Sequence, residues 1–224
     1  LNSVTFSSSI TVLGVQAFHF CTSLNSLQIP QSVTRIGDSC FSDCRGLQVI
    51  SLPESVVNVG SGAFFGCTGL TQINISGNLD SIAKSTFYNC TSLTEISLPS
   101  TITSIGESAF YSCIQLISIA LPTSTLSLEK YSFAQCSALS GIQLSDSLET
   151  IDELVFANCK SLTTFNISVN VSSIEGNAFV NCSNLDSFVV DSNNKHYSVS
   201  NGVLFNENAS ELIKYPSHIN NESY

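Results

Sequence analysis

The chain has 224 residues, of which 43% are hydrophobic and only 11% are charged, and its formal net charge is −10. This length suits one or two ordinary domains or one continuous array, and the apolar content is sufficient for a packed core. The acidic balance argues against nucleic acid or an anionic membrane surface as a partner, and no apolar run approaches the roughly 20 residues that span a bilayer.

Phenylalanine and cysteine recur together at a fixed step of 23 residues, with the phenylalanine three positions before the cysteine. A constant period of this size is typical of stacked repeats. We therefore predict an α/β repeat solenoid over residues 1–190, made of eight units that begin at Leu1 and the strand of a ninth. The cysteines of this ladder are Cys21, Cys44, Cys67, Cys90, Cys113, Cys136, Cys159 and Cys182.

Each unit opens with a pattern that predicts one short parallel strand. Leu27 and Ile29 stand two apart and therefore share one face of an extended chain, while Gln28 faces the other way. Pro30 follows directly, and proline ends a strand because it cannot donate to the ladder. A single 23-residue unit buries too little to fold alone, so successive strands are expected to pair between neighbouring coils.

The second half of each unit predicts a turn and then a short helix or helical turn. In the fifth unit, Gly106 marks the turn. Ile105, Ala109, Phe110 and Cys113 stand at i, i+4, i+5 and i+8, which places them on one side of a helix.

The last segment departs from the 23-residue pattern. Asn201-Gly202 separates two alternating runs, 197–200 and 203–206, and this dipeptide predicts a tight hairpin. We treat residues 191–224 as a variant terminal unit with a β-hairpin that can serve as a cap.

The cysteine ladder has three readings. A cysteine that recurs in every unit has the same role in each of them, so a column of buried free thiols is favoured over catalysis. Disulfides between coils are disfavoured because the Cβ vectors should be parallel, and Cys40–Cys44 is the least implausible local pair. Metal binding lacks a C-x-x-C pair or a histidine partner.

No motif of an enzyme or cofactor site occurs in the sequence. His19, His196 and His218 are scattered, and no nucleophile elbow, phosphate loop or zinc-binding helix motif is present. We therefore expect neither a catalytic site nor a cofactor.

The residues beside the inward strand positions form the candidate binding surface, which we call the strand face. Solenoids use such extended faces for protein ligands, although solvation of a polar sheet remains the alternative. These side chains are small and almost uncharged, without the Trp, Tyr or Arg that usually dominates binding, so contacts would be weak and multiple, or the site would lie on another face. The strand face comprises Gln28, Ser51, Gln72, Asn74, Glu95, Ser97, Gln143, Thr164 and Asn166.

The assembled unit, L-x-x-I-x-L-P-x-S-[VI]-x-x-I-G-x-x-A-F-x-x-C, resembles the BspA-like class of leucine-rich repeats. Residues 24–46 and 93–115 carry nearly all of it, and residues 188–216 resemble a variant unit of the same family. The resemblance implies a curved right-handed coil in a cell-surface or secreted protein of bacteria or mucosal protozoa. It also implies adhesion, with extracellular matrix or host-cell surface proteins as partners.

A structural spacer that presents another domain is the alternative function. The repeat pattern is already running at Leu1, so we expect a piece of a longer protein. Missing targeting signals then carry no information about location.

Overall fold

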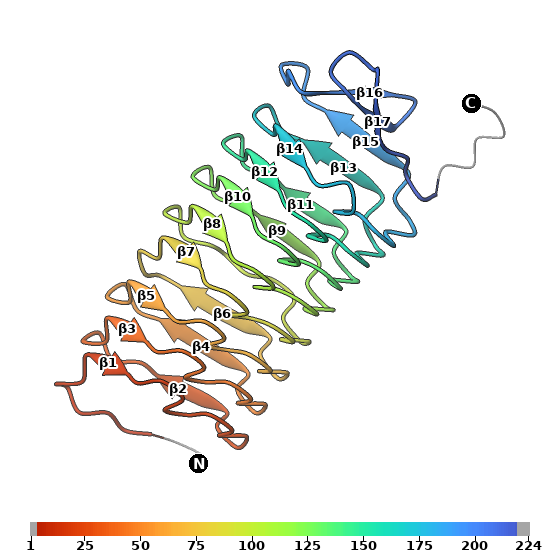
Figure 1. Cartoon of the computed structure of the whole chain (residues 1–224). Helices are drawn as coiled ribbons and strands as arrows, with labels where there is room; N and C mark the ends of the chain where they lie inside the picture. Colours follow the sequence, from red (N-terminus) through yellow and green to blue (C-terminus); the bar gives the residue numbers. More distant parts are fainter. Residues whose placement is uncertain (1–3, 219–224) are drawn as a thin grey trace.

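The computed structural model describes residues 4–218, so the first unit's Leu1 and the end of the terminal unit, 219–224, lie outside the described residues. The chain winds into a β-solenoid in which one coil stacks on the next, with the two ends of the chain at opposite ends of the stack (Figure 1). Each parallel register pair joins residues one repeat apart, as Leu27 with Ile50 and Ile50 with Ile73. The predicted solenoid and its parallel strands are therefore confirmed.

The predicted strands form the first ladder of the coil. Their alternating burial follows the sequence pattern, since Leu27 and Ile50 face the core while Gln28 and Ser51 face solvent. The strands pair in the orders β2-β4-β6, β9-β11 and β13-β15. Their bounds are β2 (Ser26–Gln28), β4 (Val49–Leu52), β6 (Gln72–Ile75), β9 (Ser118–Ala120), β11 (Gly141–Gln143), β13 (Thr164–Ile167) and β15 (Ser187–Val190).

A second ladder of two-residue strands follows in each coil, where the sequence showed only a pair of apolar residues three apart. The second residue of each strand, such as Ile36, carries the inward side chain. These strands pair in the orders β1-β3-β5 and β7-β8-β10-β12-β14. Their bounds are β1 (Val12–Leu13), β3 (Arg35–Ile36), β5 (Asn58–Val59), β7 (Ser81–Ile82), β8 (Ser104–Ile105), β10 (Ser127–Leu128), β12 (Thr150–Ile151) and β14 (Ser173–Ile174).

The expected helical turn is wrong: residues 4–218 contain no helix, and the segment that ends at the repeat cysteine is a series of tight turns. In residues 37–44, alternate N–H groups donate within the coil, as Cys44 to Phe41 at 3.1 Å, and to the next coil, as Phe41 to Ala63 at 2.8 Å. We call this the turn ladder. Ser39 and Asp43 adopt positive φ values of 51° and 56°, which break any helical run.

In the turn ladder, hydrogen bonds between coils take the place of the i→i−4 hydrogen bonds of a helix. The same pattern of inward residues results, since Ile105, Ala109, Phe110 and Cys113 are all fully buried. Spacing of about four residues therefore fitted a helix face and a pair of consecutive turns equally well.

A column of phenylalanines runs through the core. The rings of Phe87 and Phe110 stack at 5.3 Å between centroids, and those of Phe110 and Phe133 at 5.2 Å. The same stacking extends from Phe18 to Phe179. Phenylalanine therefore recurs every 23 residues because identical rings stack from one coil to the next.

The recurring cysteines form a second column in the core. The Cys113 thiol donates to the backbone oxygen of Phe87 in the preceding coil, with 3.2 Å between sulfur and oxygen. The other members from Cys44 to Cys182 make the equivalent bond at 3.0–3.2 Å. A small apolar residue with a weak donor thus suits this position in every coil.

The terminal segment lies against the last coil. β16 (Tyr197–Ser200) and β17 (Val203–Asn206) form an antiparallel hairpin, and β18 (Leu212–Lys214) joins β17. Asn201 and Gly202 have φ values of 50° and 81°, as the predicted two-residue hairpin requires. The Tyr197 hydroxyl accepts the N–H of Ile174 at 2.9 Å, and the Gly202 carbonyl accepts that of Phe188 at 2.9 Å.

Candidate functional site

The structure places all nine residues of the strand face on the solvent side of the first ladder. Each of them is exposed, because each lies directly beside an inward residue of an extended segment. Within residues 4–218, Thr164 alone among them has a side-chain hydrogen bond, to the Ser187 hydroxyl at 3.2 Å. The remaining amides, hydroxyls and carboxylate of the face are directed to solvent and are open to a ligand.

The first ladder is interrupted in the fifth coil, where the sequence predicted another strand. Within the part of the chain that the structure describes, residues 95–97 make one isolated bridge, Asn74 with Ser97, and no pairing with β9. Glu95, Ile96 and Ser97 alternate as the paired strands do, so the local pattern does not distinguish this coil.

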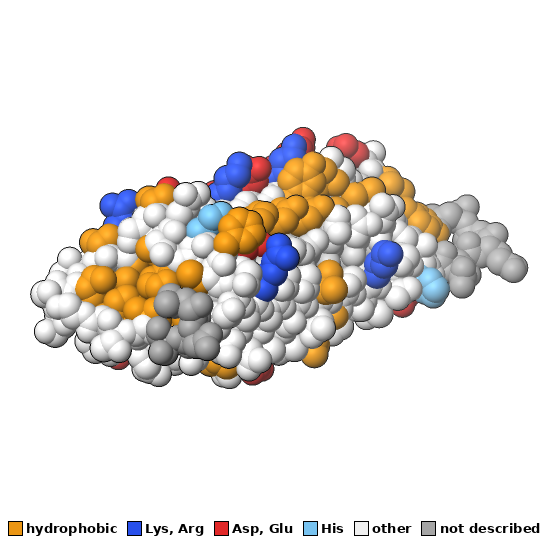
Figure 2. Space-filling view, turned by 90° about the horizontal axis from the view of Figure 1, so that it is seen from below, with side chains coloured by type: hydrophobic (Ala, Val, Ile, Leu, Met, Phe, Trp, Pro, Cys, Tyr) orange, Lys and Arg blue, Asp and Glu red, His pale blue; other side chains and the backbone are white. Residues whose placement is uncertain are grey.

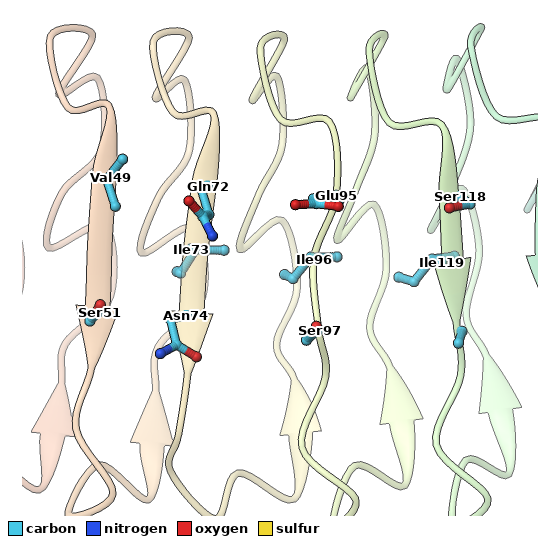
Figure 3. A pocket seen from close by; sticks show the side chains of 11 residues that line it. Val49, Ser51, Gln72, Ile73, Asn74, Glu95, Ile96, Ser97, Ser118 and Ile119 are labelled. Atoms are coloured by element: carbon cyan, nitrogen blue, oxygen red, sulfur yellow. The ribbon is translucent and has the colours of Figure 1, made fainter.

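A hollow of about 480 Å³ opens at this interruption. Figure 3 shows its side chains in successive coils, with Gln72 and Asn74 on β6 and Glu95 and Ser97 in the next coil. These four and Ser51 are predicted residues that line the hollow together. Glu95 is the one charged side chain in its lining, so the hollow presents a single carboxylate among neutral hydrogen-bonding groups.

A second hollow of about 420 Å³ lies toward the C-terminal end of the face. It brings Gln143 and Asn166 together with Asp146 and Asp191. Gln28 and Thr164 line neither hollow.

Sequence reasoning missed several members of the face. Val49 and Ser118 occupy the same ladder position as Gln72, and Ala120 the same position as Asn74. Val49 and Ala120 were missed because polarity was used as the criterion, whereas the 23-residue step alone would have included all three. From the first hollow toward the second, the face is lined by the small residues Ser118, Ala120 and Gly141.

The buried cysteines do not form a reactive site. All nine are free thiols, including Cys40 and Cys44, and all but the half-exposed Cys21 are buried. Burial raises the pKa of Cys40 and of Cys44 to about 12, and it raises the pKa of Cys113 well above its ordinary value. Since the thiolate is the nucleophile, these groups are unreactive in the folded chain.

Neither a metal centre nor a membrane span is found in the described residues. Across residues 4–218, no three or more His, Cys, Asp or Glu side chains are grouped so as to hold a metal ion. In the same range no helix has the length and apolar character to cross a bilayer.

Comparison with known proteins agrees with this architecture. The model of the BspA type leucine rich repeat region matches residues 1–117 and 103–222, with six copies. The chain belongs to the BspA-type leucine-rich repeat family. No curated protein matches the chain.

Two solved structures of similar fold are from bacteria. A leucine rich repeat protein of T. pallidum is 31% identical with a TM-score of 0.64, over 68% of this chain and 72% of that one. A leucine rich cell surface protein of Faecalibacterium prausnitzii is 24% identical with a TM-score of 0.65, over all of this chain and 55% of that one. This BspA-type chain thus spans about half the length of the F. prausnitzii protein.

Proposed function

We propose that this BspA-type chain is a non-enzymatic surface protein that recognises a protein partner, in adhesion, through its strand face. The observation that carries the proposal is the row of exposed hydrogen-bonding side chains, eight of the nine without a side-chain hydrogen bond within residues 4–218, which includes the hollow at Glu95. Extended faces of this kind are the binding surfaces of repeat proteins.

The composition of the face sets the kind of binding. None of the nine residues of the strand face is aromatic or an arginine, so no single contact is expected to dominate binding. Many weak hydrogen bonds along successive coils suit an extended partner such as an extracellular matrix protein or a host-cell surface protein. A surface or secreted location accords with the description of the F. prausnitzii structure as that of a cell surface protein.

The test is saturable binding of the chain to a panel of extracellular matrix proteins and to epithelial cells. The variant Glu95→Arg/Gln143→Arg places two bulky cations in the two hollows. Glu149→Arg/Gln115→Arg makes the same change of charge at exposed positions away from the strand face.

Binding that is lost in the first variant and kept in the second supports recognition by the strand face. Binding that survives in both variants moves the site to another surface. Absence of binding to every member of the panel favours the alternative, a structural spacer that presents another domain.

A further inference from the structure

A stripe of aromatic side chains lies on the turn ladder, away from the strand face. The rings of Phe65 and Tyr88 stack at 4.7 Å between centroids, as do those of Tyr88 and Tyr111, and Tyr131 meets Tyr111 edge-on at 6.4 Å. All four are half-buried. We call these residues the aromatic stripe. Figure 2 shows hydrophobic side chains gathered in a line, with basic and acidic side chains along its edge.

The aromatic stripe is not part of the repeat that builds the coil. Phe65, Tyr88 and Tyr111 each follow the column phenylalanine by one residue. The same position holds Ser42 in the second unit and Ala134 in the sixth. A packing requirement of the coil would recur in every unit, as the phenylalanine and cysteine columns do. A role specific to this part of the surface explains aromatic residues in three consecutive units better.

A hollow of about 490 Å³ adjoins the end of the stripe at Tyr131, and it is lined by Glu107, Glu129, Lys130 and Asp152 in addition to the tyrosine. Two carboxylates of this region are neutralised within the protein. Lys84 pairs with Glu107 at 2.7 Å, and Lys130 pairs with Glu153.

Two further carboxylates of the hollow, Glu129 and Asp152, form no ion pair within residues 4–218. Glu129 accepts the backbone N–H of Glu107 at 3.0 Å, and the Asp152 side chain accepts that of Glu153 at 2.7 Å. Neither takes part in an ion pair with Lys or Arg there. Two lysines, Lys84 and Lys130, thus face four carboxylates, and the aromatic stripe leads directly into a region of net negative charge.

The geometry narrows the class of partner. Stacking covers both faces of the Tyr88 ring, so a sugar cannot lie flat on it, and mainly ring edges and hydroxyls remain accessible. The net charge of −10 opposes a second copy of this chain as well as nucleic acid and anionic lipid. An apolar side chain suits the ring edges, and a cation suits Glu129 and Asp152.

We propose that the aromatic stripe and its adjoining hollow dock a basic polypeptide segment. An apolar side chain of the segment packs along the edges of Tyr88 and Tyr111, and a neighbouring arginine or lysine reaches Glu129 and Asp152. This site is independent of the strand face, and its partner need not be the one that the strand face recognises.

The test uses a capped hexapeptide of alternating leucine and arginine, with leucine–glutamine and leucine–glutamate peptides as matched probes. The protein has no tryptophan, and three of its six tyrosines belong to the stripe, so binding there should change the tyrosine fluorescence. Glu129→Gln/Asp152→Asn keeps the shape of both side chains and should weaken binding of the arginine peptide about tenfold, the sum of two partly exposed ion pairs. Tyr111→Ala should weaken it further.

Glu54→Gln/Glu149→Gln removes the same charge from exposed positions elsewhere and should leave binding unchanged. Circular dichroism of each variant checks that the fold is kept, and the isosteric pair provides the test if Tyr111→Ala is unstable. Equal affinity for the three peptides, no binding of the arginine peptide, or unchanged affinity in Glu129→Gln/Asp152→Asn would overturn the proposal. Loss of binding in Glu95→Arg instead would assign the peptide to the strand face and overturn it too.

Discussion

Truncation of a ring in the phenylalanine column should be among the most destabilising single changes in the solenoid. Phe110 is fully buried, and its ring stacks on Phe87 on one side and on Phe133 on the other. Phe→Ala in a core costs about 3–5 kcal/mol, and the two aromatic contacts contribute about 0.5–1.5 kcal/mol each beyond area burial. Because neighbouring coils hold the cavity open, we expect Phe110→Ala to cost about 4–5 kcal/mol.

The assay is urea unfolding followed by far-UV circular dichroism, with Phe20→Ala as the matched control. Phe20 is 56% exposed, so its truncation should cost less than about 1 kcal/mol. A difference of less than about 1 kcal/mol between the two variants would refute the idea that the column carries a large part of the stability.

Three further predictions concern the turns and the thiols. Gly77→Ala should cost about 1–3 kcal/mol, since the added Cβ would lie 2.0 Å from the Val56 carbonyl oxygen, whereas Gly176→Ala, with no atom within 4 Å of the new Cβ, should change the free energy of unfolding by less than about 0.5 kcal/mol. The free energy of unfolding should fall as pH rises above about 8.5, because burial raises the pKa of Cys113 and its column neighbours and only the unfolded chain releases these protons. Cys113→Ser should make the decline of this free energy with pH shallower. An unchanged slope in this variant would contradict the proposed cause. A thiol reagent added to the folded chain should label Cys21 rapidly and the other eight cysteines only after urea is added, as counted by mass spectrometry.

Much of the fold could be predicted because the period is written into single residue types. A phenylalanine at the position of Phe110 and a cysteine at the position of Cys113 recur every 23 residues. A residue with the same neighbours in each coil must be in an equivalent environment. The strand positions around Leu27 followed from alternation, and the hairpin from Asn201-Gly202. The strand face could be located in the same way, since outward positions are set by inward ones.

The helical turn could not be excluded from the sequence, because inward residues four apart satisfy a helix and a pair of tight turns alike. The positive φ values of Ser39 and Asp43 decide between the two. Because neither residue is glycine, the local sequence does not indicate these φ values. The interruption at Glu95 also escaped prediction, because its alternation matches that of the paired strands.

The sequence by itself determined the solenoid, its period, its inward columns and the polar character of its strand face, because these depend on which residue recurs at each step. Only the tertiary structure decided the turn ladder, the hollow beside Glu95 and the excess of carboxylates at the end of the aromatic stripe. The physical reason is that these features arise from contacts between coils. Hydrogen bonds and stacked rings join residues 22 to 26 positions apart, beyond the reach of any local pattern.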